Sequence, residues 1–194
     1  GMRAAHDFAA VARYLAPGDP EVVAYLERVD QADRLRELNR AAERALQAGD
    51  LGESGGGALA LFRQVLAERP GQPRAMQGMA AVESAMIRRA ELAADAADYR
   101  LADEWLGHAA RVRPGFPTVD DARRRLEGVR AAHVRRLRDE GVDALPRING
   151  VSVARARLAE IIAIADPGDP VANDLRERID RAVHYGDFRP GQVF

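Results

Sequence analysis

The stretch Glu68-Arg69-Pro70-Gly71-Gln72-Pro73-Arg74-Ala75 interrupts two helix-favouring runs with two prolines and a glycine. Proline disfavours helical backbone in the residue before it, yet it is tolerated in the first turn of a helix, and glycine relaxes the turn between the two. The pattern PGxP therefore predicts the end of one helix and the start of the next. The chain of 194 residues contains four copies, which begin at residues 17, 70, 114 and 167.

The spacing of these copies indicates a repeated unit. The intervals are 53, 44 and 53 residues, within the range of repeat proteins. Alanine, leucine and arginine dominate between the copies and β-branched residues rarely cluster, which favours helix. We expect an all-α protein of about eight helices, arranged as helical hairpins and divided near 17–20, 70–73, 114–117 and 167–170.

Apolar periodicity predicts that each unit holds a long helix followed by a short one. Apolar residues recur every three or four positions from Val22 to Leu46, as in an amphipathic helix, and the glycine-rich segment 52–57 follows. Further breaks are expected at 97–99 and 141–150. The helix over 171–183 has no partner after it, and residues 8–15 are expected to form the short helix of an incomplete first unit.

Composition excludes several kinds of chemistry. The chain has no lysine and no cysteine, so it lacks a Schiff-base lysine, a P-loop lysine, a thiol nucleophile and disulfides. No apolar run approaches the roughly 18 residues of a membrane span. The histidines show no i, i+4 pair typical of a metal site, and we expect no cofactor; they are His6, His108, His133 and His184.

One segment matches a catalytic motif. Gly52-Glu53-Ser54-Gly55-Gly56 has the G-x-S-x-G spelling of a nucleophile elbow. That elbow requires a strand entering and a helix leaving, with strain that presents the serine. Here a helix precedes the segment and the glycines relieve strain. We therefore expect an interhelical loop and a chain that is not an enzyme.

The third long helix is rich in arginine and supplies the candidate partner-binding residues Arg123, Arg124, Arg130, Arg135 and Arg138. Such a helix can bind an acidic peptide, phosphate or nucleic acid. Nucleic acid is the least favoured partner, because no aromatic residues interleave the arginines. The sequence favours instead a solvated face that is neutralised by nearby carboxylates, namely Asp120, Asp121, Asp139 and Glu140. His133 falls on the apolar stripe of this helix and is interpreted as structural.

The short helices resemble the second helix of tetratricopeptide repeats. The offsets fit in two units, as Ala58, Phe62, Val65, Leu66 and Pro70 and as Ala102, Leu106, Ala109, Ala110 and Pro114. The third unit fits with one extra residue, as Ala154, Leu158, Ile161, Ile162 and Pro167. The first helices depart from the family, because they are longer than a repeat of about 34 residues allows. The resemblance implies a TPR-like α-solenoid over residues 1–188, in which Phe62 and Trp105 pack between helices.

The last seven residues, FRPGQVF, resemble the lead-in from a helical region to a formylglycine-generating-enzyme (sulfatase-modifying-factor) type domain in bacterial proteins. Similar helical regions are also attached to bacterial serine/threonine kinase domains. The resemblance implies that residues 189–194 form an exit segment toward a further domain. It also implies that the protein is located in the bacterial periplasm or envelope. The expected function is a scaffold or spacer that binds a protein, a peptide or a neighbouring domain; the alternative is a regulatory or positioning region.

Overall fold

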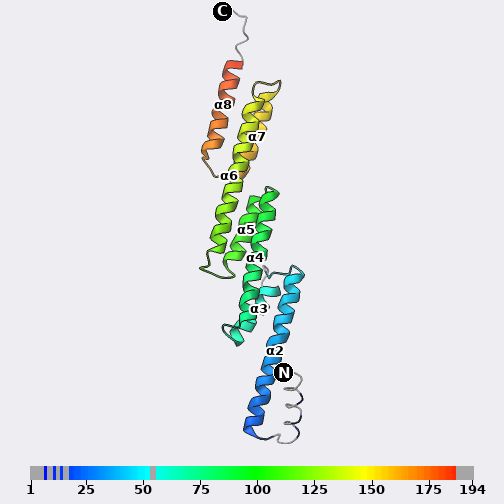
Figure 1. Ribbon diagram of the computed structural model, residues 1–194. Helices are drawn as coiled ribbons and strands as arrows, with labels where there is room; N and C mark the ends of the chain where they lie inside the picture. The colour runs from blue at the N-terminus through cyan, green and yellow to red at the C-terminus, as the bar shows by residue number, and fades with distance from the viewer. Residues whose placement is uncertain (1–6, 8–10, 12–13, 15–17, 53–55, 187–194) are drawn as a thin grey trace, which may run out of the picture. The chain divides into compact units, whose positions relative to one another are not determined.

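The computed structural model describes residues 18–52 and 56–186, together with residues 7, 11 and 14. This part of the chain contains seven α-helices and no strand, so the all-α prediction is confirmed (Figure 1). Most of the expected helix near residues 8–15, Ser54 and the whole exit segment over 189–194 lie outside the described residues. The helices are α2 (Pro20–Gln47), α3 (Gly57–Glu68), α4 (Pro73–Asp95), α5 (Tyr99–Ala110), α6 (Thr118–Ala144), α7 (Gly150–Ile164) and α8 (Pro170–Gly186).

The PGxP copies lie between helices. The copies at 70–73, 114–117 and 167–170 separate α3 from α4, α5 from α6, and α7 from α8. In the first copy the described residues begin at Gly18, and Pro20 opens α2. The glycines of the other three copies have positive φ, between 76° and 86°, a conformation that glycine adopts without a steric penalty.

The variable residue of the motif contributes to the start of the following helix. The Asp19 carboxylate accepts a hydrogen bond of 2.8 Å from the backbone N–H of Glu21. Gln72 Oε1 accepts one of 2.6 Å from Ala75. Such side-chain acceptors satisfy N–H groups that have no partner within the helix. The motif thus supplies both the glycine of the turn and, in these copies, the cap of the next helix.

The chain divides into two compact units, residues 1–86 with 108–115 and residues 87–107 with 116–194. In the first unit α2 packs against α3, and the Phe62 ring is fully buried. Gly78 on α4 lies against that ring, because a Cβ added there would overlap it. Buried Glu83 accepts two hydrogen bonds from Arg113, at 2.9 and 2.8 Å, and this bonding raises the pKa of Arg113.

In the second unit α7 packs against both α6 and α8. The core consists of apolar residues from these three helices, Val134, Leu137, Ala154, Ile161, Ala172, Leu175 and Ile179. The expected break over 141–150 is wrong in its extent, since α6 continues to Ala144 and only 145–149 separate it from α7. A Cβ at Gly141 would lie 3.0 Å from the methyl groups of Leu175, so this glycine permits close packing on α8 instead of ending the helix.

Three large apolar residues of the helices are exposed. Val129 on α6 is 42% exposed, Ile162 on α7 is 55% exposed, and Val183 on α8 is 39% exposed. In α7 the core is reached by Ala154 and Ile161. Ile162 is one position beyond Ile161, about 100° further around the helix, so it turns away from that core.

Candidate functional site: a groove beside α6

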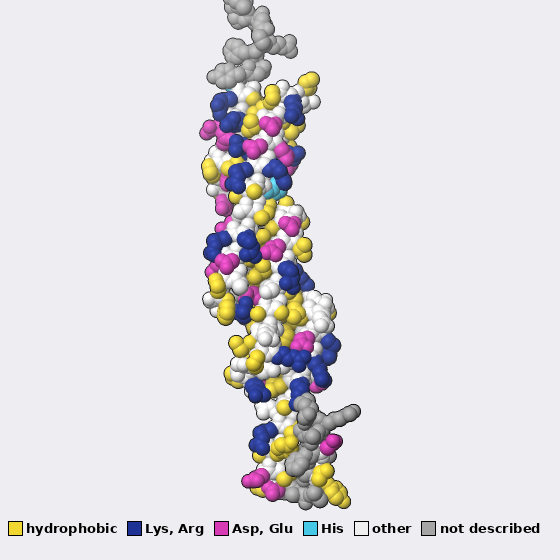
Figure 2. Space-filling view, viewed as in Figure 1, with side chains coloured by type: hydrophobic (Ala, Val, Ile, Leu, Met, Phe, Trp, Pro, Cys, Tyr) yellow, Lys and Arg dark blue, Asp and Glu magenta, His cyan; other side chains and the backbone are white. Residues whose placement is uncertain are grey.

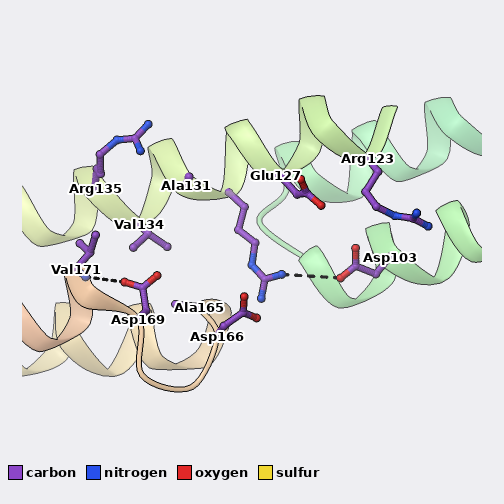
Figure 3. A pocket seen from close by; sticks show the side chains of 11 residues that line it. Asp103, Arg123, Glu127, Ala131, Val134, Arg135, Ala165, Asp166, Asp169 and Val171 are labelled. Carbon is purple, nitrogen blue, oxygen red and sulfur yellow. Dashed lines mark hydrogen bonds and ion pairs between the residues drawn. The ribbon is translucent and has the colours of Figure 1, made fainter. Parts of the chain in front are cut away.

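A groove of about 500 Å³ lies in the second unit, between α6, the first turns of α5 and the turn that joins α7 to α8 (Figure 3). Its apolar surface comes from Ala131, Val134, Ala165 and Val171. Its charged lining consists of Asp103, Arg123, Glu127, Arg130, Arg135, Asp166 and Asp169. The volume falls within the range of about 300–1,000 Å³ that is usual for ligand sites in proteins.

Helical periodicity and the PGxP turn position the lining. Glu127, Ala131 and Val134 are spaced by four and three residues, so they share one face of α6. The opposite side is the turn from Asp166 to Asp169. The Asp169 carboxylate accepts hydrogen bonds from the backbone N–H groups of Val171 at 2.7 Å and Ala172 at 3.2 Å, which holds the turn against the start of α8.

Arg130 is held by contacts inside the unit. Its Nε donates a hydrogen bond to the backbone carbonyl of Ile164, the last residue of α7. The carbonyls at a helix C-terminus have no partner within the helix, so this bond satisfies one of them. The guanidinium also lies 4.0 Å from the Asp103 carboxylate and 5.7 Å from the centre of the Tyr99 ring. Arg130 therefore links α6 to α5 and α7.

The five candidate arginines do not form one free basic face. Four of them have a carboxylate partner: Arg123 with Asp120 at 3.4 Å, Arg124 with Asp121, Arg130 with Asp103, and Arg138 with Asp139 at 3.1 Å. Arg135 has no ion pair within the described part of the chain. Basic and acidic side chains are interspersed on the face drawn in Figure 2. Only three of the five line the groove, namely Arg123, Arg130 and Arg135.

Two acidic residues of the groove were not singled out from the sequence. The side chains of Glu127 and Asp166 are exposed and have neither a hydrogen bond nor an ion pair among the described residues. Figure 3 shows the carboxylates of Asp103, Glu127 and Asp166 directed toward the same part of the groove. A sequence signal for Asp166 exists, because it directly precedes the fourth PGxP copy and so belongs to an interhelical turn.

The histidine and the aromatic residues noted in the sequence take part in packing. The Nδ1 atom of half-buried His133 lies 2.9 Å from the hydroxyl of Tyr99, and burial raises the pKa of Tyr99. Phe62 is fully buried, whereas Trp105 is partly exposed, with the Arg89 guanidinium 4.6 Å from its ring centre. These contacts agree with a packing role for His133 and Phe62.

Comparison of the chain with protein families, curated proteins and solved structures gave no match. In the described part of the chain, no three acidic, histidine or cysteine side chains are grouped so that they could hold a metal ion. None of the described helices combines the length and the apolar character needed to cross a membrane. Residues 50–52, which lead into the segment around Ser54, are not in a strand.

Proposed function

We propose that this chain is a non-catalytic helical-repeat region that binds a peptide segment of a partner protein in the groove beside α6. The observation that carries the proposal is the composition of this groove. An apolar floor lies next to two carboxylates that have no partner in the described residues. Peptide sites combine these two features, since apolar contact contributes affinity and a few polar groups contribute specificity.

The repeated helical pairs support a binding role. Arrays of stacked hairpins present extended concave surfaces on which they recognise peptides and proteins. Three complete PGxP copies separate successive helices of this chain, as a TPR-like solenoid requires. We extend the proposal to the solenoid arrangement itself, on the basis of these turns and of the alanine and leucine positions in α3 and α5.

The bound segment can also belong to a neighbouring domain of the same protein. The resemblance of FRPGQVF to the lead-in of a formylglycine-generating-enzyme type domain supports this form of the proposal, as does the similarity to kinase-associated helical regions. The chain would then position or regulate that domain. Nucleic-acid binding has less support, because most of the arginines proposed for it have carboxylate partners.

A peptide-display selection against the whole chain tests the proposal. Ala131→Tyr fills the groove from an exposed position on α6, so it should abolish binding of the selected peptides without unfolding the chain. The matched control is Ala156→Tyr, at an exposed position on α7 that does not line the groove. Retained binding by the Ala131 variant, or a selection that enriches no peptide, would refute the proposal.

A further inference from the structure

The charges that line the groove are not equally available to a ligand. The Asp169 carboxylate already accepts two backbone hydrogen bonds at the start of α8. Arg130 is engaged by the Ile164 carbonyl and is near Asp103. Arg123 lies within 3.4 Å of Asp120, a residue that does not line the groove. A ligand that enters the groove therefore meets mainly Glu127, Asp166 and Arg135, the charged lining residues whose side chains have no partner among the described residues.

Glu127 and Asp166 are the acidic side chains of the groove without a partner among the described residues. Glu127 comes from α6 and Asp166 from the turn after α7, so they approach the groove from its two sides (Figure 3). The guanidinium of Arg135 is directed away from both of these carboxylates in the same view. The Arg130 guanidinium also reaches this part of the groove, where it lies 4.0 Å from Asp103 (Figure 3). The lining has four acidic and three basic residues, so its formal charge is −1, although α6 is rich in arginine.

We propose that the groove selects a peptide segment that carries an arginine or lysine, with its cation between Glu127 and Asp166. Small apolar neighbours of that residue would rest on Ala131, Val134 and Ala165. This inference rests on the proposed function and adds the chemistry of the ligand. It differs from the acidic partner considered for the arginines of α6, because four of those five arginines have carboxylate partners, whereas Glu127 and Asp166 have none among the described residues.

The test is an NMR titration of the whole chain at low salt with three blocked tripeptides. Ala-Arg-Ala carries the cation, Ala-citrulline-Ala is its uncharged counterpart of similar shape, and Ala-Glu-Ala carries the opposite charge. The titrations are repeated with Asp166→Asn and Glu127→Gln. Asp143→Asn removes one negative charge from an exposed position of α6 outside the groove, and so controls for net charge.

The arginine tripeptide should shift the amide signals of Ala131, Val134 and Ala165 and should bind more tightly than its citrulline counterpart. Asp166→Asn and Glu127→Gln should each weaken this binding about two- to five-fold, the range of a partly exposed ion pair. Asp143→Asn should leave it unchanged. Equal binding of the citrulline peptide, tighter binding of the glutamate peptide, or no shift at the groove amides would overturn the inference.

These outcomes separate the inference from the proposed function. A display-selected peptide that lacks a basic residue, but is lost in Ala131→Tyr, refutes the inference and leaves the binding groove intact. Failure of the display selection itself removes both. A selected peptide whose affinity depends on Asp166 and on its own arginine or lysine supports both.

Discussion

Glu83 carries a carboxylate into the interior of the first unit, where it is 0% exposed, and Arg113 donates two hydrogen bonds to it. Removing one partner of a buried ion pair takes away hydrogen bonds that stabilise the other charge, and it costs about 3–5 kcal/mol. Glu83→Ala should lower the free energy of unfolding by this amount in urea denaturation. The double replacement Glu83→Met with Arg113→Met should cost less, since no charge is then left buried.

The contrasting case is the exposed pair of Glu43 and Arg74, for which Glu43→Ala should cost no more than about 1 kcal/mol. An equal loss of stability for Glu43→Ala and Glu83→Ala would contradict the role given to burial.

Glu43 also gives a pH-dependent prediction. The hydrogen bond from Arg74 lowers the pKa of Glu43 below its ordinary value. A group with a lowered folded-state pKa contributes stability above its unfolded pKa, about 4.3 for glutamate, and this contribution is lost as the pH falls through the folded-state pKa. The stability difference between the wild type and Glu43→Gln should therefore be present at pH 7 and diminish in acid.

Urea unfolding at several pH values measures this difference, with Glu37→Gln as the control, because Glu37 pairs with Arg40 within α2. A stability difference between the wild type and Glu43→Gln that grows as the pH falls would show that the pKa of Glu43 is not lowered in the folded chain.

Local residue contacts were predictable from the sequence, whereas contacts between helices were not. Asp120 and Asp121 lie three positions before Arg123 and Arg124, so helical spacing alone places these side chains together. The bond from Arg130 to Ile164 joins residues 34 positions apart and depends on which helix faces meet. The free carboxylates of the groove could be found only after these pairings were known.

At the scale of the element, glycine has opposite roles within helices of this chain. Gly78 on α4 has no room for a side chain because the Phe62 ring lies against it, whereas a Cβ at Gly128 on α6 would meet nothing within 4 Å. Gly78→Ala should destabilise the chain by about 1–3 kcal/mol through overpacking. Gly128→Ala should stabilise it by up to about 1 kcal/mol, as expected for an open helical position.

Thermal unfolding of both variants measures these effects. Stabilisation by Gly78→Ala would contradict the packing of α4 against α3.

Helix boundaries followed from the sequence where the turn is local. The PGxP copies combine a glycine of positive φ with a proline, so they end and begin helices whatever the rest of the chain does. Gly141 shows the limit of this reasoning, because it lies inside α6 where Leu175 of α8 packs closely. A glycine that serves packing and one that ends a helix have the same sequence signal until the neighbouring helix is known.

At the scale of the whole molecule, the described residues form two compact units, and the proposed binding groove belongs to the second. The formal net charge of the chain is −1, which gives no indication of the sign of a partner. The proposed sign rests on the distribution of ion pairs, since most of the arginines of α6 pair with carboxylates of the chain. Helical composition and repeated turns are the basis of the proposed scaffold role, and the groove is its proposed binding site.

A crystal structure of the chain with a display-selected peptide tests whether the groove beside α6 binds a peptide through a basic residue of that peptide. We expect the peptide to lie along Ala131 and Val134, with an arginine or lysine within hydrogen-bond distance of Glu127 and Asp166. A peptide bound elsewhere on the chain, or an acidic side chain bound at these two carboxylates, would refute the proposed binding mode.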